Sequence, residues 1–140
     1  MDFSSIDFVA VLVAFLVSFV TGFLWFGPKT FFPVWWKAMG KTGDPGEGAD
    51  MKVVFASTAV AGLVSATGLA LVFDVVAKAS GDLSALTGFT TGLIVGVFVM
   101  AAPALSHRLF AGNGFKVWLL EVGADVLAFA LMGVALSFFY

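Results

Sequence analysis

The chain has no cysteine, which excludes disulfides, thiolate nucleophiles and cysteine-ligated metal sites. Charge is also scarce, because Asp, Glu, Lys and Arg make up only 11% of the 140 residues and the net charge is -2. An ordinary soluble domain carries about 25% charged residues, so this chain lacks the side chains that a water-facing surface requires. No basic block is present, and we therefore exclude nucleic acid as a partner.

Motifs that carry catalysis are absent from the sequence as well. It has no phosphate-binding glycine loop, no His-x-x-x-His zinc pair and no Gly-x-Ser-x-Gly elbow. The single histidine, His107, follows Ser106, but the nearest Asp is distant in the sequence, so the pair does not indicate a catalytic triad. Haem bound by His107 would need a second ligand, and Met100 lies on another turn of the helix. The acids of residues 42–50 lack the alternating spacing of a calcium loop. We expect no enzyme activity, no cofactor and no metal.

What the chain does contain is four apolar runs, within a composition that is 61% hydrophobic. Each run is close to the ~20 residues that span the hydrocarbon of a bilayer. The first lacks a preceding basic segment and exceeds the apolar core of a signal peptide, so we expect it to be retained. The sequence predicts an all-α, single-domain integral membrane bundle over residues 1–140, with spans at about 8–26, 53–77, 86–105 and 117–139.

The basic residues are unevenly placed between these runs. Only Lys78 lies in the second connection, whereas the other six lie in the first and third connections: Lys29, Lys37, Lys41, Lys52, Arg108 and Lys116. Loops rich in Lys and Arg remain in the cytoplasm. We expect a multi-pass protein of the bacterial inner membrane with both termini on the periplasmic or external side.

Small residues spaced four apart form a stripe in each run, and such stripes let membrane helices approach closely. The most regular stripe has three glycines, which predict a close helix contact within the bundle or between subunits. The stripes are Ala10, Ala14, Ser18 and Gly22; Gly62, Ala66 and Ala70; Gly88, Gly92 and Gly96; and Ala124 and Ala128.

The segment that follows the first run mixes aromatic, proline and lysine residues. The two prolines at positions 28 and 33 disfavour helix at the residues before them, so the first helix should end near Phe26. A short interfacial helix should follow within residues 28–40, close to Trp25. Its helical projection places Phe32, Trp35, Trp36 and Met39 on one face and Lys37 and Lys41 on the other. We interpret it as a membrane anchor, with recognition of a lipid or partner as the alternative.

Three acids lie within or near the apolar runs and are candidate site residues. Asp74 stands four residues before Lys78 and should pair with it at headgroup depth. Glu121 and Asp125 lie four apart on one face of the last run, where an acid is expensive unless it is paired or hydrated. Arg108 or Lys116 could neutralise Glu121, with Asp125 bonded to a serine, threonine or carbonyl. Alternatively, the two carboxylates form a proton or cation relay.

Two segments resemble a known family. The first runs Gly22-Phe-Leu-Trp25-Phe-Gly-Pro28, followed by Phe31 and Trp35-Trp36-Lys37; the second joins His107-Arg-Leu-Phe110 to Lys116-Val-Trp-Leu-Leu-Glu-Val-Gly123. Together they are similar to a bacterial group of small four-helix membrane proteins, the domain of unknown function 1761. Phe26 stands where that family usually has tyrosine. The resemblance implies a fold and a membrane location and supplies no activity.

Three functional hypotheses follow. The first is a structural or accessory subunit, which forms a homo-oligomer or joins a larger membrane complex, because the chain offers much contact surface and little chemistry. The second is a small proton or cation transporter that uses Glu121 and Asp125. The third is binding of membrane lipid or an apolar ligand beside Trp35 and Trp36.

Overall fold

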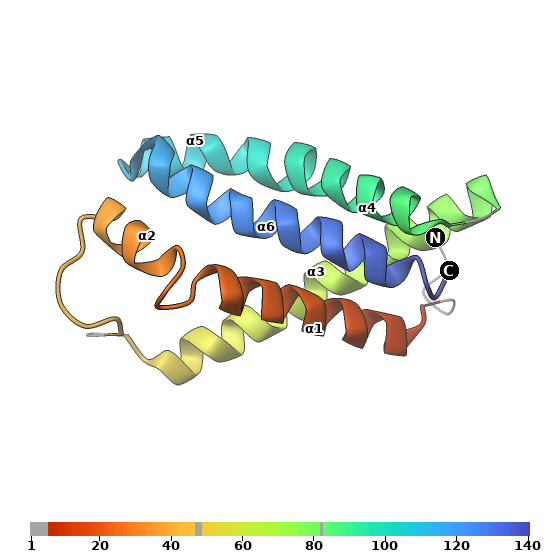
Figure 1. Cartoon of the computed structure of the whole chain (residues 1–140), viewed down its shortest axis with the longest axis horizontal. Coiled ribbons are helices and arrows are strands. Elements are labelled where there is room, and N and C mark those ends of the chain that lie inside the picture. The colour runs from red at the N-terminus through yellow and green to blue at the C-terminus, as the bar shows by residue number, and fades with distance from the viewer. Residues whose placement is uncertain (1–5, 47–48, 82) are drawn as a thin grey trace.

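The computed structural model describes residues 6–46, 49–81 and 83–140, and within them it contains helices and no strand (Figure 1). Four of its helical runs are long and apolar enough to cross a membrane, which confirms the predicted all-α class. The elements are α1 (Phe8–Trp25), α2 (Phe32–Ala38), α3 (Met51–Ser80), α4 (Ala85–Ile94), the π-helical segment η2 (Val95–Ala101), α5 (Ala102–Phe110) and α6 (Gly114–Leu136).

Three of these helices begin where a side chain can accept the free backbone N–H groups of the first turn. Asp7 caps α1, Asp50 caps α3 and Ser84 caps α4. The second apolar run is therefore helical beyond its expected bounds. The third run is also longer than expected, because α4, η2 and α5 form one continuous helix that ends at Phe110. Pro103 does not break it, since it stands in the first turn of α5, directly after the π-helical segment.

Helix α6 is the central element of the bundle. It packs against α4, η2 and α5 on one side and against α1 on the other, as Figure 1 shows. Helix α3 crosses α1 and reaches α6 only along part of its length. The buried core joins α1, α3 and α6 through Ala10, Val11, Ala14, Ala66, Leu69, Ala70, Phe73, Phe129, Met132 and Leu136.

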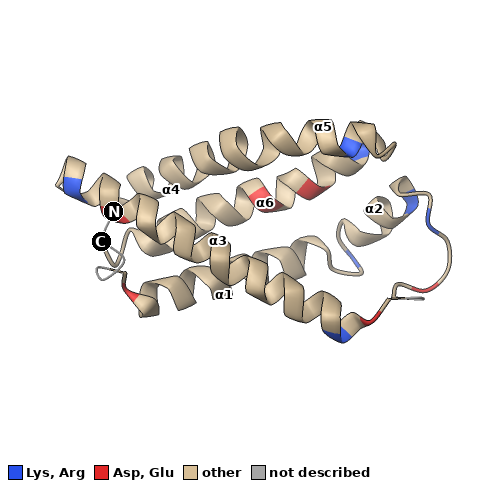
Figure 2. Cartoon of the chain, turned by 180° about the vertical axis from the view of Figure 1, so that it is seen from behind, with Lys and Arg blue, Asp and Glu red and all other residues tan. Residues whose placement is uncertain are grey.

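The two ends of the bundle differ in charge, as Figure 2 shows. We call the end that contains α2, the α5–α6 turn and the start of α3 the basic end, because six of the seven basic residues lie there. We call the other end the terminal end, because the start of α1 and the end of the chain meet there. The backbone N–H of Asp7 donates to the Tyr140 hydroxyl across 3.4 Å.

The glycine stripe of the third run lies against α6. A Cβ built on Gly92 would stand 2.1 Å from the Phe129 carbonyl oxygen, and one on Gly88 would stand 2.4 Å from the Gly133 oxygen. No side chain fits at such distances, so glycine is required for these two backbones to touch. The contact at Gly96 is less tight, because a Cβ there would stand 3.0 Å from the Val126 Cα. The three glycines therefore make their contact inside this chain.

The stripe of α1 is only partly in contact with a neighbour. Ala10 and Ala14 are fully buried in the core with Ala66 and Ala70 of α3, and a Cβ on Gly62 would lie 3.9 Å from the Ser18 hydroxyl. Gly22 departs from the expected pattern, because a Cβ added there would meet nothing within 4 Å. The α1–α3 contact therefore ends before the last turn of α1.

Beyond that crossing point, α3 diverges from the rest of the bundle. Figure 1 shows that its Met51 end lies away from α6. Phe55 continues the inward face of Gly62, Ala66 and Leu69 by helical spacing, yet its side chain is 58% exposed. Nearly all of residues 51–61 are exposed. The basic-end half of α3 thus contributes nothing to the core.

Candidate functional site

Tryptophan side chains converge on the first half of α6. The Trp25 indole Nε1 donates to the Leu120 carbonyl across 2.9 Å. The ring lies so close to Gly123 that a Cβ there would stand 2.9 Å from the Trp25 Cζ2 atom. Trp25 therefore joins the end of α1 to α6 and requires a glycine beneath it, in addition to any role at a membrane boundary.

Trp118, in α6 itself, makes the corresponding bond to the other side of the bundle. Its Nε1 donates to the Ala101 carbonyl across 3.0 Å, at the junction of η2 and α5. Its ring also lies 4.9 Å from that of Phe115. This contact was missed by sequence reasoning, which gave Trp118 no role; the only available signal was its place inside the second family segment, Lys116 to Gly123.

Glu121 joins three helices through its two carboxylate oxygens. Oε2 lies 2.5 Å from the Arg108 Nε of α5, and Oε1 accepts from the Trp35 Nε1 of α2 at 3.0 Å. The Glu121 side chain is 17% exposed, so the pair is shielded from water on the carboxylate side. Of the two expected partners, Arg108 is the one that neutralises Glu121, and no ion pair with Lys116 occurs among the described residues.

The aromatic residues of α2 form a cluster beside this centre. The rings of Phe32 and Trp36 stack at 5.6 Å, and the rings of Trp35 and Trp36 lie 6.0 Å apart. Phe26 meets Trp35 edge-on at 5.6 Å. The aromatic face of α2 is therefore held by ring contacts and by the Trp35–Glu121 bond.

One expected feature of α2 is wrong. Lys41 does not lie opposite the aromatic face, because its Nζ stands 4.8 Å from the centre of the Trp36 ring. The helix ends at Ala38, Gly40 has a φ of 70°, and the Lys41 N–H returns to the Trp36 carbonyl. If the helix had continued past Ala38, Lys41 would lie on the face opposite the Trp36 ring. The buried Trp36 Nε1 has no hydrogen-bond partner within the described part of the chain.

Asp125 lies one helical turn after Glu121, but its surroundings are different. It lies at the middle of α6, eleven residues from either end, and its side chain is exposed. It faces the same way as Phe129 and Met132, which pack against α3 further along. At the level of Asp125, α3 has already diverged.

The bond expected for Asp125 to a serine, threonine or carbonyl is absent. Across residues 6–46, 49–81 and 83–140, no hydrogen bond or ion pair reaches its carboxyl group. We call the region of Phe55 on α3 and Asp125 on α6 the uncovered surface, because each residue shares a helix face with buried residues further along, yet both are exposed.

The remaining candidate acid, Asp74, lies near the terminal end. Its carboxylate accepts from the Lys78 Nζ at 2.7 Å, in the expected pair, but the residue is only 5% exposed. It is buried next to the core residues Ala70 and Phe73. Its contacts are those of a structural ion pair.

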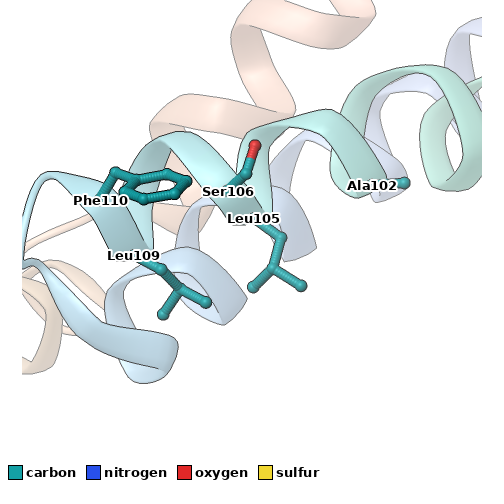
Figure 3. Close-up of a pocket in the computed structure, with 5 residues that line it drawn as sticks. All are labelled: Ala102, Leu105, Ser106, Leu109 and Phe110. Carbon is teal, nitrogen blue, oxygen red and sulfur yellow. The ribbon is translucent and has the colours of Figure 1, made fainter.

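Two surface cavities lie on α5 and beside α2. One is a groove of about 430 Å³ on α5, and Figure 3 shows the residues that line it: Ala102, Leu105, Ser106, Leu109 and Phe110. Its only hydroxyl, that of Ser106, donates to the Pro103 carbonyl of the same helix, so the groove offers apolar contact. The second cavity lies between α2 and α6 at the basic end.

No group of three potential metal ligands occurs among the described residues.

Comparison with known proteins gives one match. A family model described as "Protein of unknown function (DUF1761)" matches residues 9–137, which is nearly the whole chain. No curated protein and no solved structure matches significantly.

Proposed function

The chain belongs to the DUF1761 family, and we propose that it is a structural or accessory subunit of the bacterial inner membrane that forms a homo-oligomer. The basic end would face the cytoplasm, because loops rich in Lys and Arg are retained there. The single observation that carries the proposal is Asp125, an exposed acid at the middle of a helix long enough to span a bilayer.

The position of Asp125 is unfavourable for a chain surrounded by lipid. From either end of α6 it is ~17 Å away, at 1.5 Å per residue. An Asp at the centre of a membrane helix costs roughly 2.5–3.5 kcal/mol on insertion scales. A neighbour that supplies a hydrogen-bond donor removes much of that cost.

A second copy offers the matching surface. Phe55 on the diverging half of α3 is exposed on a helix face that is buried further along, and the same holds for Asp125 on α6. If two chains face each other about a two-fold axis, α3 of each can cover the uncovered surface of the other. The two Asp125 carboxyls can then share a proton, as close acid pairs do.

The absence of cysteine makes a clean crosslinking test available. Asp125→Cys in membranes should give disulfide-linked dimers under mild oxidation. Leu127→Cys is the matched control, because Leu127 lies at the same depth on another face of α6 and is 38% exposed. Dimers from Asp125→Cys alone support the homo-oligomer. A strict monomer by native mass spectrometry from mild detergent would overturn it, and a second protein in that spectrum would replace it with a larger complex.

The relay hypothesis gains little from the geometry. Arg108 and Trp35 engage both oxygens of Glu121, so this carboxylate is not free to pass a cation to Asp125. Proton and sodium flux in proteoliposomes should therefore be the same for wild type and Asp125→Asn. Flux that is lost in the variant would favour the transporter instead.

The proposed orientation can be tested separately. Lys41→Cys at the basic end should be labelled by a membrane-impermeant maleimide only after the cells are opened. Ala79→Cys, exposed at the terminal end, should be labelled in intact spheroplasts. The reverse pattern would show that the basic end faces outward.

A further inference from the structure

The second cavity brings together two lysines from different parts of the chain. It has a volume of about 520 Å³ and is lined by Pro33, Val34, Lys37 and Ala38 of α2 and by Lys116 of α6. Both lysines are exposed, and Val34 is 40% exposed. The cavity is therefore cationic at two points and apolar between them.

No nearby acid cancels this charge. None of the residues that line the cavity is acidic, and the Glu121 carboxylate is occupied by Arg108 and Trp35. Neither Lys37 nor Lys116 forms an ion pair within the described residues. Lys41 is not part of the cavity, because it lies over the Trp36 ring.

We propose that this cavity binds the headgroup of an anionic phospholipid. Lys37 and Lys116 would contact the phosphate oxygens from two sides, because ammonium groups bind phosphate as compact point charges. The first acyl carbons would lie along Pro33, Val34 and Ala38. A free anion would use the lysines but gain nothing from these apolar residues, which is why we assign a lipid rather than soluble phosphate.

The site differs from the lipid site expected at Trp35 and Trp36. Trp35 points into the bundle, where it donates to Glu121, and Trp36 stacks on Phe32 beneath Lys41. The lysine-bearing face of α2 is thus the one left for a ligand. This inference does not depend on Asp125 or on the oligomeric state.

The test measures quenching of tryptophan fluorescence by brominated phosphatidylglycerol against brominated phosphatidylcholine in mixed micelles. Trp35 and Trp36 of the intact chain act as reporters on α2. We expect wild type to prefer phosphatidylglycerol, and Lys37→Ala/Lys116→Ala to lose about 30-fold in relative affinity, from ~1 kcal/mol per lysine. Lys37→Arg/Lys116→Arg should remain within about threefold of wild type, since the charges stay.

Lys29→Ala/Lys52→Ala is the matched control, since it removes the same charge from the same end at exposed lysines outside the cavity. We expect it to keep most of the preference. An equal loss of relative affinity in both double variants would overturn the proposal, because the lipid would then be attracted by the overall positive charge of the basic end and not by this cavity. Displacement of the lipid by millimolar glycerol phosphate would overturn it too, since the site would then recognise a soluble anion.

Discussion

The two halves of the bundle are held together by different interactions. In the terminal half, α4 meets α6 through glycines so closely that backbones touch, and α1 meets α3 through fully buried alanines. In the basic half, indole N–H groups and one ion pair join the helices, and α3 leaves the bundle. The first half has close backbone contact, and the second has directed polar bonds from side chains to the neighbouring helices.

This difference indicates which half can change its arrangement. Contacts between backbones have no side-chain rotamers to adjust, so they fix the helix crossing in one geometry. Indole and carboxylate bonds can break and re-form one by one, and each is worth only ~1 kcal/mol net. The proposed lipid site lies in the half built this way, and the proposed subunit surface extends from that half to the middle of α6.

The largest loss of stability is expected when a side chain is placed in the glycine contact between α4 and α6. Gly92→Ala should destabilise the bundle by roughly 3 kcal/mol, because overpacking against backbone cannot be relieved by rotamer changes. Gly68→Ala is the matched control on α3, since a Cβ there would meet nothing within 4 Å. It should be neutral or stabilising by up to ~1 kcal/mol through helix propensity. Thermal unfolding in detergent measures both, and equal stability of the two variants would contradict the close contact.

In the basic half, the largest single loss is expected at Glu121. Glu121→Gln keeps the shape but removes the charge that pairs with Arg108, and should cost about 2 kcal/mol. The double variant Glu121→Gln/Arg108→Gln should recover part of that loss, because no unpaired charge then remains. If the two single substitutions simply add, the ion pair does not stabilise the fold.

The sequence predicted four long apolar helices, because long apolar runs allow few alternatives. Helical spacing alone also places Glu121 and Asp125 on one face of the last helix. It could not supply their different surroundings, which depend on the angle at which α3 crosses α1. That angle follows from side-chain packing between residues far apart in the chain, such as Phe15 against Gly62.

The tryptophans show the same limit. Sequence reasoning placed Trp25, Trp35 and Trp36 at a membrane boundary from composition, because aromatic belts are common there. The structure gives two of them a specific acceptor on α6, Leu120 for Trp25 and Glu121 for Trp35. Composition predicts where an indole is stable, whereas its hydrogen-bond partner depends on the tertiary fold.

A finer test compares two neighbouring indoles of α2. Trp35→Phe removes the donor to Glu121 and should cost about 1 kcal/mol. Trp36→Phe removes similar ring area from an indole whose Nε1 has no partner in the described structure, so it should cost less. Trypsin cleavage after Lys37 and Lys41 should accelerate more in Trp35→Phe. Equal rates in the two variants would mean that the bond to Glu121 does not hold α2 in place.

The smallest expected effect lies in the terminal half, at Tyr140. Burial raises the pKa of its hydroxyl above the ordinary value of 10.0, because the phenolate would lose hydration. The folded state therefore favours the neutral phenol, and stability is constant below pH ~10 and falls as the pH rises through the raised pKa. Tyr140→Phe should lack this alkaline loss and, at neutral pH, lose only the long bond from Asp7. An unfolding series across alkaline pH checks this. An identical pH dependence in the variant would show that Tyr140 does not sense the closure of the terminal end.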